Sequence, residues 1–106
     1  MPRWLPKVLT RVRGLAAKGK VRFTLKALPE LASLGLGLDA EDARDVLVRL
    51  RSRDSAGRVA SAGTGEWMYV FKPRIAGMVV YVKVILRDDC LVVSFHEDEG
   101  SRNENE

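Results

Sequence analysis

The strongest constraint on the fold is the alternation of side chains along residues 79–86. Every second position there carries an aliphatic residue that suits a protein core: Val80, Val82, Val84 and Leu86. The positions between them include Tyr81 and Lys83. Successive residues of a β-strand point to opposite faces of the sheet. The run therefore predicts a strand with one apolar face and one face that presents Tyr81 beside Lys83.

A second run of the same kind follows at residues 91–96. With a period of two, one face holds Leu91, Val93 and Phe95, and the other holds Val92, Ser94 and His96. A third run, residues 67–71, is also rich in strand-forming residues, and its Trp67 and Phe71 are expected in the core. If the runs pair, a tyrosine, a lysine and a histidine share one side of a sheet whose other side is buried.

The front of the chain has helical spacing instead. Apolar residues recur every three or four positions within residues 7–18, 24–34 and 39–50. Helices followed by strands are typical of two packed layers. The order predicts an α+β fold in which about three helices pack on one face of a three- to four-stranded antiparallel sheet. We expect residues 1–97 to form a single domain and residues 98–106 to form an acidic, disordered tail.

The third of these helices has clear start and stop signals. Asp39 is a strong N-cap candidate, and acidic residues follow it in the first turn. Arg49, Arg51 and Arg53 lie near the expected C-terminal end, where the helix dipole favours positive charge. These three arginines thus have a structural explanation that needs no ligand.

Charge is distributed unevenly along the chain. The net charge of the 106 residues is +4, but the first 26 residues contain eight bases and no acid. Such a segment attracts polyanions, of which nucleic acid is the first candidate. The alternative is a solvated helix face without a ligand.

Composition narrows the chemistry. With one histidine and one cysteine, the chain can form neither a disulfide framework nor a cysteine-rich zinc site, and it fits a reducing cytoplasm. Cys90 is expected to be a small buried residue. Ser94 and His96 have no acid partner that would complete a serine triad. No apolar run approaches the ~20 residues of a membrane span, so no membrane partner is expected.

Acid–base chemistry on a polyanion, without a metal or other cofactor, is what remains. Cleavage of RNA in this way needs a group that takes the proton of the 2′-hydroxyl, cations that stabilise the phosphorane and an acid for the leaving oxygen. Side chains with suitable chemistry are His96, Lys83, Arg74, Arg58 and Tyr81.

Motifs along nearly the whole ordered chain follow the spacing of one protein family. They are Trp67…Val70-Phe71-Lys72-Pro73-Arg74, Val80-Tyr81-Val82-Lys83 and Leu91–Phe95, with Gly19–Arg22 and Leu34–Leu36 nearer the front. Over roughly residues 8 to 97 the chain resembles the MqsR toxins of type II toxin–antitoxin systems. The resemblance implies a RelE-like fold and a metal-independent endoribonuclease that cleaves messenger RNA. It also implies a cognate antitoxin that neutralises the toxin, and leaves contact with the ribosome open.

The resemblance implies catalytic residues on the sheet. The family's functional tyrosine and the neighbouring lysine fall on Tyr81 and Lys83. A functional basic residue after the Ser-Phe pair falls on His96, where a family member has lysine. The glutamine that follows the tryptophan in the family is Met68 in this chain.

The expected RNA-binding residues are Arg58, Lys72 and Arg74. Arg58 is the nearest match to a loop lysine of the family, although another alignment places Gly57 there. No metal ligand is expected. The rival hypothesis is a non-catalytic module that binds nucleic acid or protein and carries a decayed RNase site, and a structural subunit without a ligand is the third choice.

Overall fold

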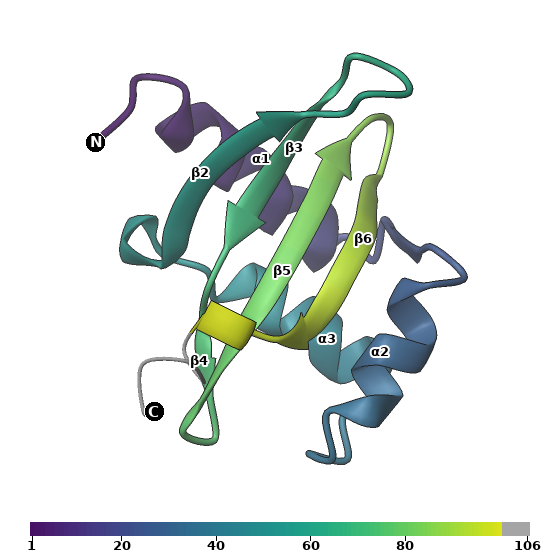
Figure 1. Cartoon of the computed structure of the whole chain (residues 1–106). Helices are drawn as coiled ribbons and strands as arrows, with labels where there is room; N and C mark the ends of the chain where they lie inside the picture. Colours follow the sequence, from purple (N-terminus) through teal and green to yellow (C-terminus); the bar gives the residue numbers. More distant parts are fainter. Residues whose placement is uncertain (101–106) are drawn as a thin grey trace.

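Residues 1–100 are described by the computed structural model as three helices and a six-stranded sheet (Figure 1). The helices are α1 (Leu5–Ala17), α2 (Ala27–Ser33) and α3 (Ala40–Val48), and a 3-10 turn, η1 (Ser52–Asp54), follows them. The strands are β1 (Val21–Phe23), β2 (Ser55–Ala60), β3 (Trp67–Phe71), β4 (Arg74–Ile75), β5 (Met78–Leu86) and β6 (Cys90–Glu97). Residues 101–106, most of the expected tail, lie outside the described residues.

The sheet is mixed and open. Its strands lie in the order β1, β6, β5, β3, β2, and the short β4 pairs with β5. All neighbours are antiparallel except β1 and β6, which are parallel. In Figure 1, α1 and α3 lie behind the sheet and α2 lies beside β6, so that the front face carries no helix. Among residues 1–100, no helix is long and apolar enough to cross a membrane.

The predicted α+β fold with three helices is confirmed, but the sheet is larger than expected. Three to four antiparallel strands were predicted, whereas β1, β2 and β4 extend the three long runs. These added strands are short or interrupted, so their sequences show little of the alternation of apolar and polar residues that predicts a strand. Gly57, with a φ of 98°, lies within a register shift of β2 and interrupts its pairing with β3.

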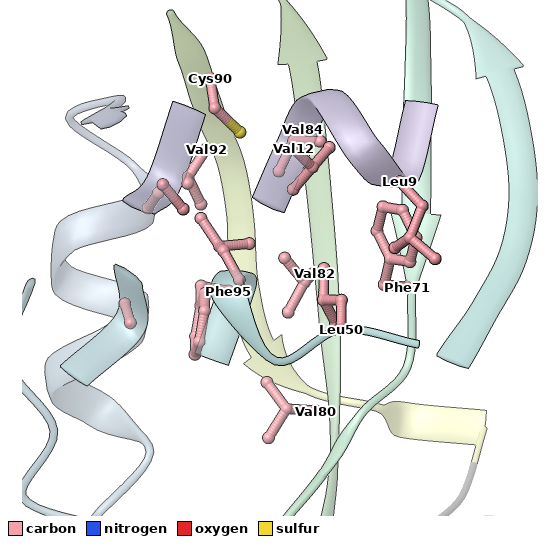
Figure 2. Packing of buried hydrophobic residues seen from close by; sticks show 14 of the residues in the cluster. Leu9, Val12, Leu50, Phe71, Val80, Val82, Val84, Cys90, Val92 and Phe95 are labelled. Atoms are coloured by element: carbon pink, nitrogen blue, oxygen red, sulfur yellow. The ribbon is translucent and has the colours of Figure 1, made fainter. Parts of the chain in front are cut away.

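The core lies between the sheet and the helices α1 and α3 (Figure 2). Phe71, Phe95 and the β5 valines at positions 80, 82 and 84 are completely buried there, in one cluster with Val12 and Leu47 from the helices. Cys90 joins this cluster, and burial raises the pKa of its thiol to about 12. The prediction that Cys90 is a small buried residue is therefore confirmed.

A bulge in β6 corrects the predicted facing of that strand. Lys83 pairs with Ser94 but Val84 pairs with Val92, which leaves Val93 as an extra residue. Leu91 and Val93 were expected on the core face of this strand. Instead Val92, just before the bulge, is fully buried in the core, and Leu91 and Val93 are only partly buried. The extra residue reverses which face of the sheet each side chain points to. The predicted facing of Ser94, Phe95 and His96 is therefore correct, and the predicted facing of Leu91, Val92 and Val93 is wrong.

The N-terminal side of α2 closes the edge of β6 where β1 ends. The Thr24 amide donates to the Val92 carbonyl at 3.0 Å, and the Thr24 hydroxyl accepts from the Ala27 amide at 3.1 Å. The Phe95 amide donates to the Glu30 carboxylate at 3.0 Å. These bonds satisfy backbone groups that an open edge strand would leave unpaired.

Helix α3 begins as predicted but ends early. Asp39 and Asp42 form a capping box in which each carboxylate accepts from the other residue's amide, at 2.9 and 3.0 Å. The helix ends at Val48, so both Arg51 and Arg53 lie beyond it: Arg51 directly precedes η1, and Arg53 lies within η1. The explanation of these two arginines by the dipole of α3 is therefore wrong, since that effect acts within the last turn.

Candidate active site

The strands β5 and β6 place polar side chains opposite one another on the face without helices. The valines at even positions of β5 point into the core, so the odd positions point to the uncovered face. On that face Tyr81 pairs with His96, and Lys83 pairs with Ser94. Directly opposite residues of an antiparallel pair have Cβ atoms about 4.5–5.5 Å apart. The pairing therefore brings Tyr81 to His96 and Lys83 to Ser94, and these two polar pairs are neighbours on one face, ~7 Å apart along the strand.

Lys72 extends the row of Tyr81 and His96 to a third strand. Because Phe71 pairs with Val82, the next residue along this antiparallel register, Lys72, lies beside Tyr81. The Lys72 ammonium forms an ion pair with Asp98, with Nζ 3.5 Å from Oδ1. The Asp98 side chain is nearly buried.

A second row, made of Arg74, Val79 and Asp98, lies two residues from Tyr81 towards the start of β5. Arg74 pairs with Val79, and the Asp98 amide donates to the Val79 carbonyl at 2.9 Å. Val79 and Tyr81 are two residues apart on one strand, which corresponds to ~7 Å. Two rows of side chains thus lie next to each other, and the Lys72–Asp98 ion pair connects them.

The imidazole of His96 is held in one orientation. It stacks on the ring of Tyr81, with ring centroids 5.1 Å apart and planes at 12°. Nδ1 lies 2.8 Å from the Glu97 carbonyl oxygen. A carbonyl only accepts, so Nδ1 must carry the hydrogen. Nε2 is therefore the ring nitrogen left to exchange a proton with a ligand.

A cluster of charges from α2 lies next to His96. Lys26 Nζ donates to the Ser94 hydroxyl at 2.9 Å and pairs with the Glu30 carboxylate at 3.1 Å. Burial works to raise the pKa of Glu30, but hydrogen bonds from the Phe95 amide and from Lys26 outweigh it and hold the pKa below its usual value. Glu30 is therefore a carboxylate at neutral pH.

A cavity of about 270 Å³ separates α2 from the end of β6. Its lining consists of Pro29, Glu30, Ser33, Leu34, His96 and Glu97. His96 thus faces Tyr81 on one side and an open cavity on the other.

Comparison with known proteins gives this geometry a context. The model of a family described as "Motility quorum-sensing regulator, toxin of MqsA" matches residues 6–97. The chain belongs to this family, the MqsR toxins. The "mRNA interferase toxin MqsR" of Escherichia coli (strain K12) is 33% identical over 90 residues, which cover 84% of this chain and 90% of that relative.

Five of the six residues predicted for the site of this MqsR-family chain lie together on the uncovered face. They are Lys72, Arg74, Tyr81, Lys83 and His96. Met68 also lies on this face but pairs with Ile85, four residues along β5 from Tyr81. That separation is ~14 Å, so the methionine does not touch the row of Tyr81 and His96.

Arg58 is not brought to the others. It pairs with Tyr69, which packs against the helix-side core, so Arg58 points to the opposite face of the sheet. Its guanidinium lies over the rings of Trp67 and Trp4, 3.9 and 4.9 Å from their centroids. The expectation that Trp67 lies in the core is wrong: it is the first residue of β3, it is 44% exposed, and Arg58 covers its ring.

Sequence reasoning missed Lys26, Glu30 and Asp98. The spacing of Lys26 and Glu30 is a helical i,i+4 pair of opposite charges, and that signal was present in the sequence. Nothing in the sequence indicated that this pair docks on β6. Asp98 was assigned to the tail, whereas its amide and carboxylate both bond to the sheet.

The arrangement can transfer a proton and stabilise negative charge at one place. Nε2 of His96 and the Tyr81 hydroxyl are proton-handling groups; Lys72 lies opposite Tyr81 in the register, and Lys83 lies two residues from Tyr81 along β5. Within residues 1–100, no three histidine, cysteine or acidic side chains come together as candidate metal ligands. These groups suit acid–base chemistry at a phosphate.

Proposed function

We propose that this chain is a metal-independent endoribonuclease toxin that cleaves messenger RNA and is neutralised by a cognate antitoxin protein. Membership of the MqsR toxin family and a relative named an mRNA interferase support the proposal. The observation that carries it is the stacked Tyr81–His96 pair beside two lysines. A merely structural sheet face has no need to orient an imidazole in this way.

In the proposed reaction the RNA supplies its own nucleophile. The 2′-oxygen loses its proton to a base and attacks the adjacent phosphorus, and the 5′-oxygen leaves with a proton from an acid. The products are a 2′,3′-cyclic phosphate and a 5′-hydroxyl. His96 carries one proton transfer through Nε2, and Tyr81 orients the imidazole and shares the other. Lys72 and Lys83 stabilise the charge that develops on the phosphate.

The test is cleavage of single-stranded RNA by the purified chain, free of antitoxin, in the presence of EDTA. His96→Ala and Tyr81→Ala should each lower the rate by about 10²-fold or more, the scale of one lost acid–base group. Val59→Ala, at an exposed valine on the same face, should leave the rate unchanged. His96→Lys should recover part of the rate with an optimum at higher pH, because lysine titrates about four units above histidine.

Several outcomes would overturn this mechanism. Loss of cleavage in EDTA, or full activity of folded His96→Ala, contradicts it. If the chain binds RNA but no condition yields cleavage, the function is that of a binding module. In cells, growth inhibition should follow the same order of variants, and co-expression of the antitoxin should relieve it.

A further inference from the structure

A second group of cations lines a groove of about 700 Å³ next to the proposed site. One wall is formed by the end of α3 and by η1, and the other by the chain from the end of β3 to the start of β5. Its basic lining residues are Arg49, Arg51, Arg53, Lys72 and Arg74. We call this feature the arginine groove. Among residues 1–100, Asp54 is the only acid in its lining.

The charges of the arginine groove are largely uncompensated. Among residues 1–100, no carboxylate forms an ion pair with the guanidinium groups of Arg49, Arg51 and Arg53. The Asp54 carboxylate instead accepts from the Arg51 backbone amide at 2.8 Å. Like charges held close together repel one another and attract an anion. Within residues 1–100, the guanidinium groups of Arg49, Arg51 and Arg53 therefore have no carboxylate counter-ion, and they could attract an external anion.

The positive surface continues on the far side of these arginines. A second cavity, of about 530 Å³, shares Arg49, Arg51 and Arg53 with the groove and adds Arg13 from α1. The three arginines therefore lie between two open cavities. Such a continuous basic surface suits a long polyanion better than a single small ion.

The lining of the groove also has an apolar part, which adjoins the proposed site. It contains Leu50, Pro73 and Val79. Val79 lies on the same face as Tyr81, ~7 Å along β5, and Lys72 belongs to both the groove and the Tyr81 row. Arginine matches phosphate oxygens with a planar pair of donors. A groove lined by both cations and apolar side chains suits the phosphates and sugars of one nucleic acid strand.

We propose that the arginine groove binds backbone phosphates of the RNA strand whose scissile phosphate lies at Tyr81 and His96. The inference rests on the proposed function, because it takes RNA as the polyanion. It assigns Arg49, Arg51 and Arg53 to substrate binding at a distance from the chemistry. Short substrates that occupy only the Tyr81 row would not need them.

The first test measures binding to a 2′-O-methyl RNA oligomer, which the proposed reaction cannot cleave. The combined variant Arg49→Gln, Arg51→Gln, Arg53→Gln is compared with Arg3→Gln, Lys7→Gln, Lys18→Gln, which loses the same charge outside the groove. Each phosphate contact on a single strand contributes about 0.7 to the log–log salt slope. The groove variant should lower that slope by about 2 and weaken binding at low salt by at least ~10-fold. Equal slopes and affinities for the two variants would overturn the proposal.

The second test separates this inference from the proposed function. The groove variant should lower kcat/KM on a long RNA but leave cleavage of a dinucleotide unchanged. If no variant cleaves RNA but the salt slopes still differ, the proposed function fails and the groove assignment stands. If RNA binding is unchanged and only neutralisation by the antitoxin is lost, the groove is a protein interface and the proposal is wrong.

Discussion

Asp98 lies where the arginine groove meets the row of Tyr81 and His96. It pairs with Lys72 at 3.5 Å, and Lys72 lies both in the arginine groove and beside Tyr81. In the free protein this carboxylate offsets the charge of the one lysine that both regions share. A phosphate that approaches Lys72 must therefore compete with Asp98.

Asp98→Asn should strengthen RNA binding. The amide keeps the size of the side chain and the backbone bond to Val79, but it frees Lys72 to contact a phosphate. The log–log salt slope should become steeper by up to about 0.7, with several-fold tighter binding at low salt. Fluorescence anisotropy with a 2′-O-methyl oligomer measures both quantities.

Asp88→Asn is the matched control for Asp98→Asn, because Asp88 is an exposed acid in the turn between β5 and β6. It changes the net charge equally at the far end of β5 from Tyr81. An equal gain in the two variants would mean that net charge alone, and not release of Lys72, governs binding.

At the scale of single elements, the bulge in β6 decides which side chains reach the core. Val82 on β5 is completely buried, whereas Val93 in the bulge is only half-buried and lies outside the core cluster. The two valines have the same shape and lie on neighbouring strands. They form a matched pair for measuring the contribution of the helix-side core.

Val82→Ala should lower the free energy of unfolding by about 2 kcal/mol, since it loses buried methyl groups and leaves a cavity. Val93→Ala should cost less than ~1 kcal/mol because its surroundings can relax towards solvent. Urea unfolding followed by circular dichroism measures both. A larger loss for Val93→Ala would place Val93 in the core and contradict the bulge.

The sequence predicted those features of the structure that depend on a single helix or strand. The uninterrupted alternation of β5 predicted the facing of Tyr81 and Lys83, and the carboxylate of Asp39 predicted the start of α3. It was uninformative where two distant elements meet. The bulge at Val93, the docking of α2 on β6 and the end of α3 before Arg51 depend on packing that local periodicity does not record.

At the scale of the whole molecule, part of the basic N-terminal segment is used internally. Arg11 donates to the Arg87 carbonyl, and Arg22 forms an ion pair with Asp89. Arg87 in turn donates two hydrogen bonds to Glu66, at 2.9 and 2.7 Å. The turn between β5 and β6 is thereby tied to α1, to β1 and to the loop before β3. These bases therefore also have a structural role, in addition to any contact with a polyanion.

Acid should weaken this end of the molecule. Hydrogen bonds from Arg87 and Thr64 lower the pKa of Glu66 from 4.5 to about 2. A depressed pKa in the folded state contributes stability above the unfolded value, and that stability is lost as the pH falls from about 4.5 towards 2. Glu66→Gln should therefore flatten the fall in melting temperature over this range.

The control for Glu66→Gln is Glu99→Gln, which removes an exposed carboxylate that has no ion pair within residues 1–100. Its melting curve should follow that of the unmodified chain at every pH. If Glu66→Gln melts with the same acid dependence as the control, the bond to Arg87 does not stabilise the fold.

The position of β6 has a consequence for the order in which the molecule is completed. This last described strand lies inside the sheet, where it pairs with β5 and, through Val21 and Cys90, with the distant β1. Pairing across such a sequence separation must wait until both partners are present. A nascent chain still attached to the ribosome before β6 emerges has Tyr81 but no His96 beside it. The stacked pair therefore cannot form until β6 has emerged, and a translation product interrupted before His96 cannot possess it.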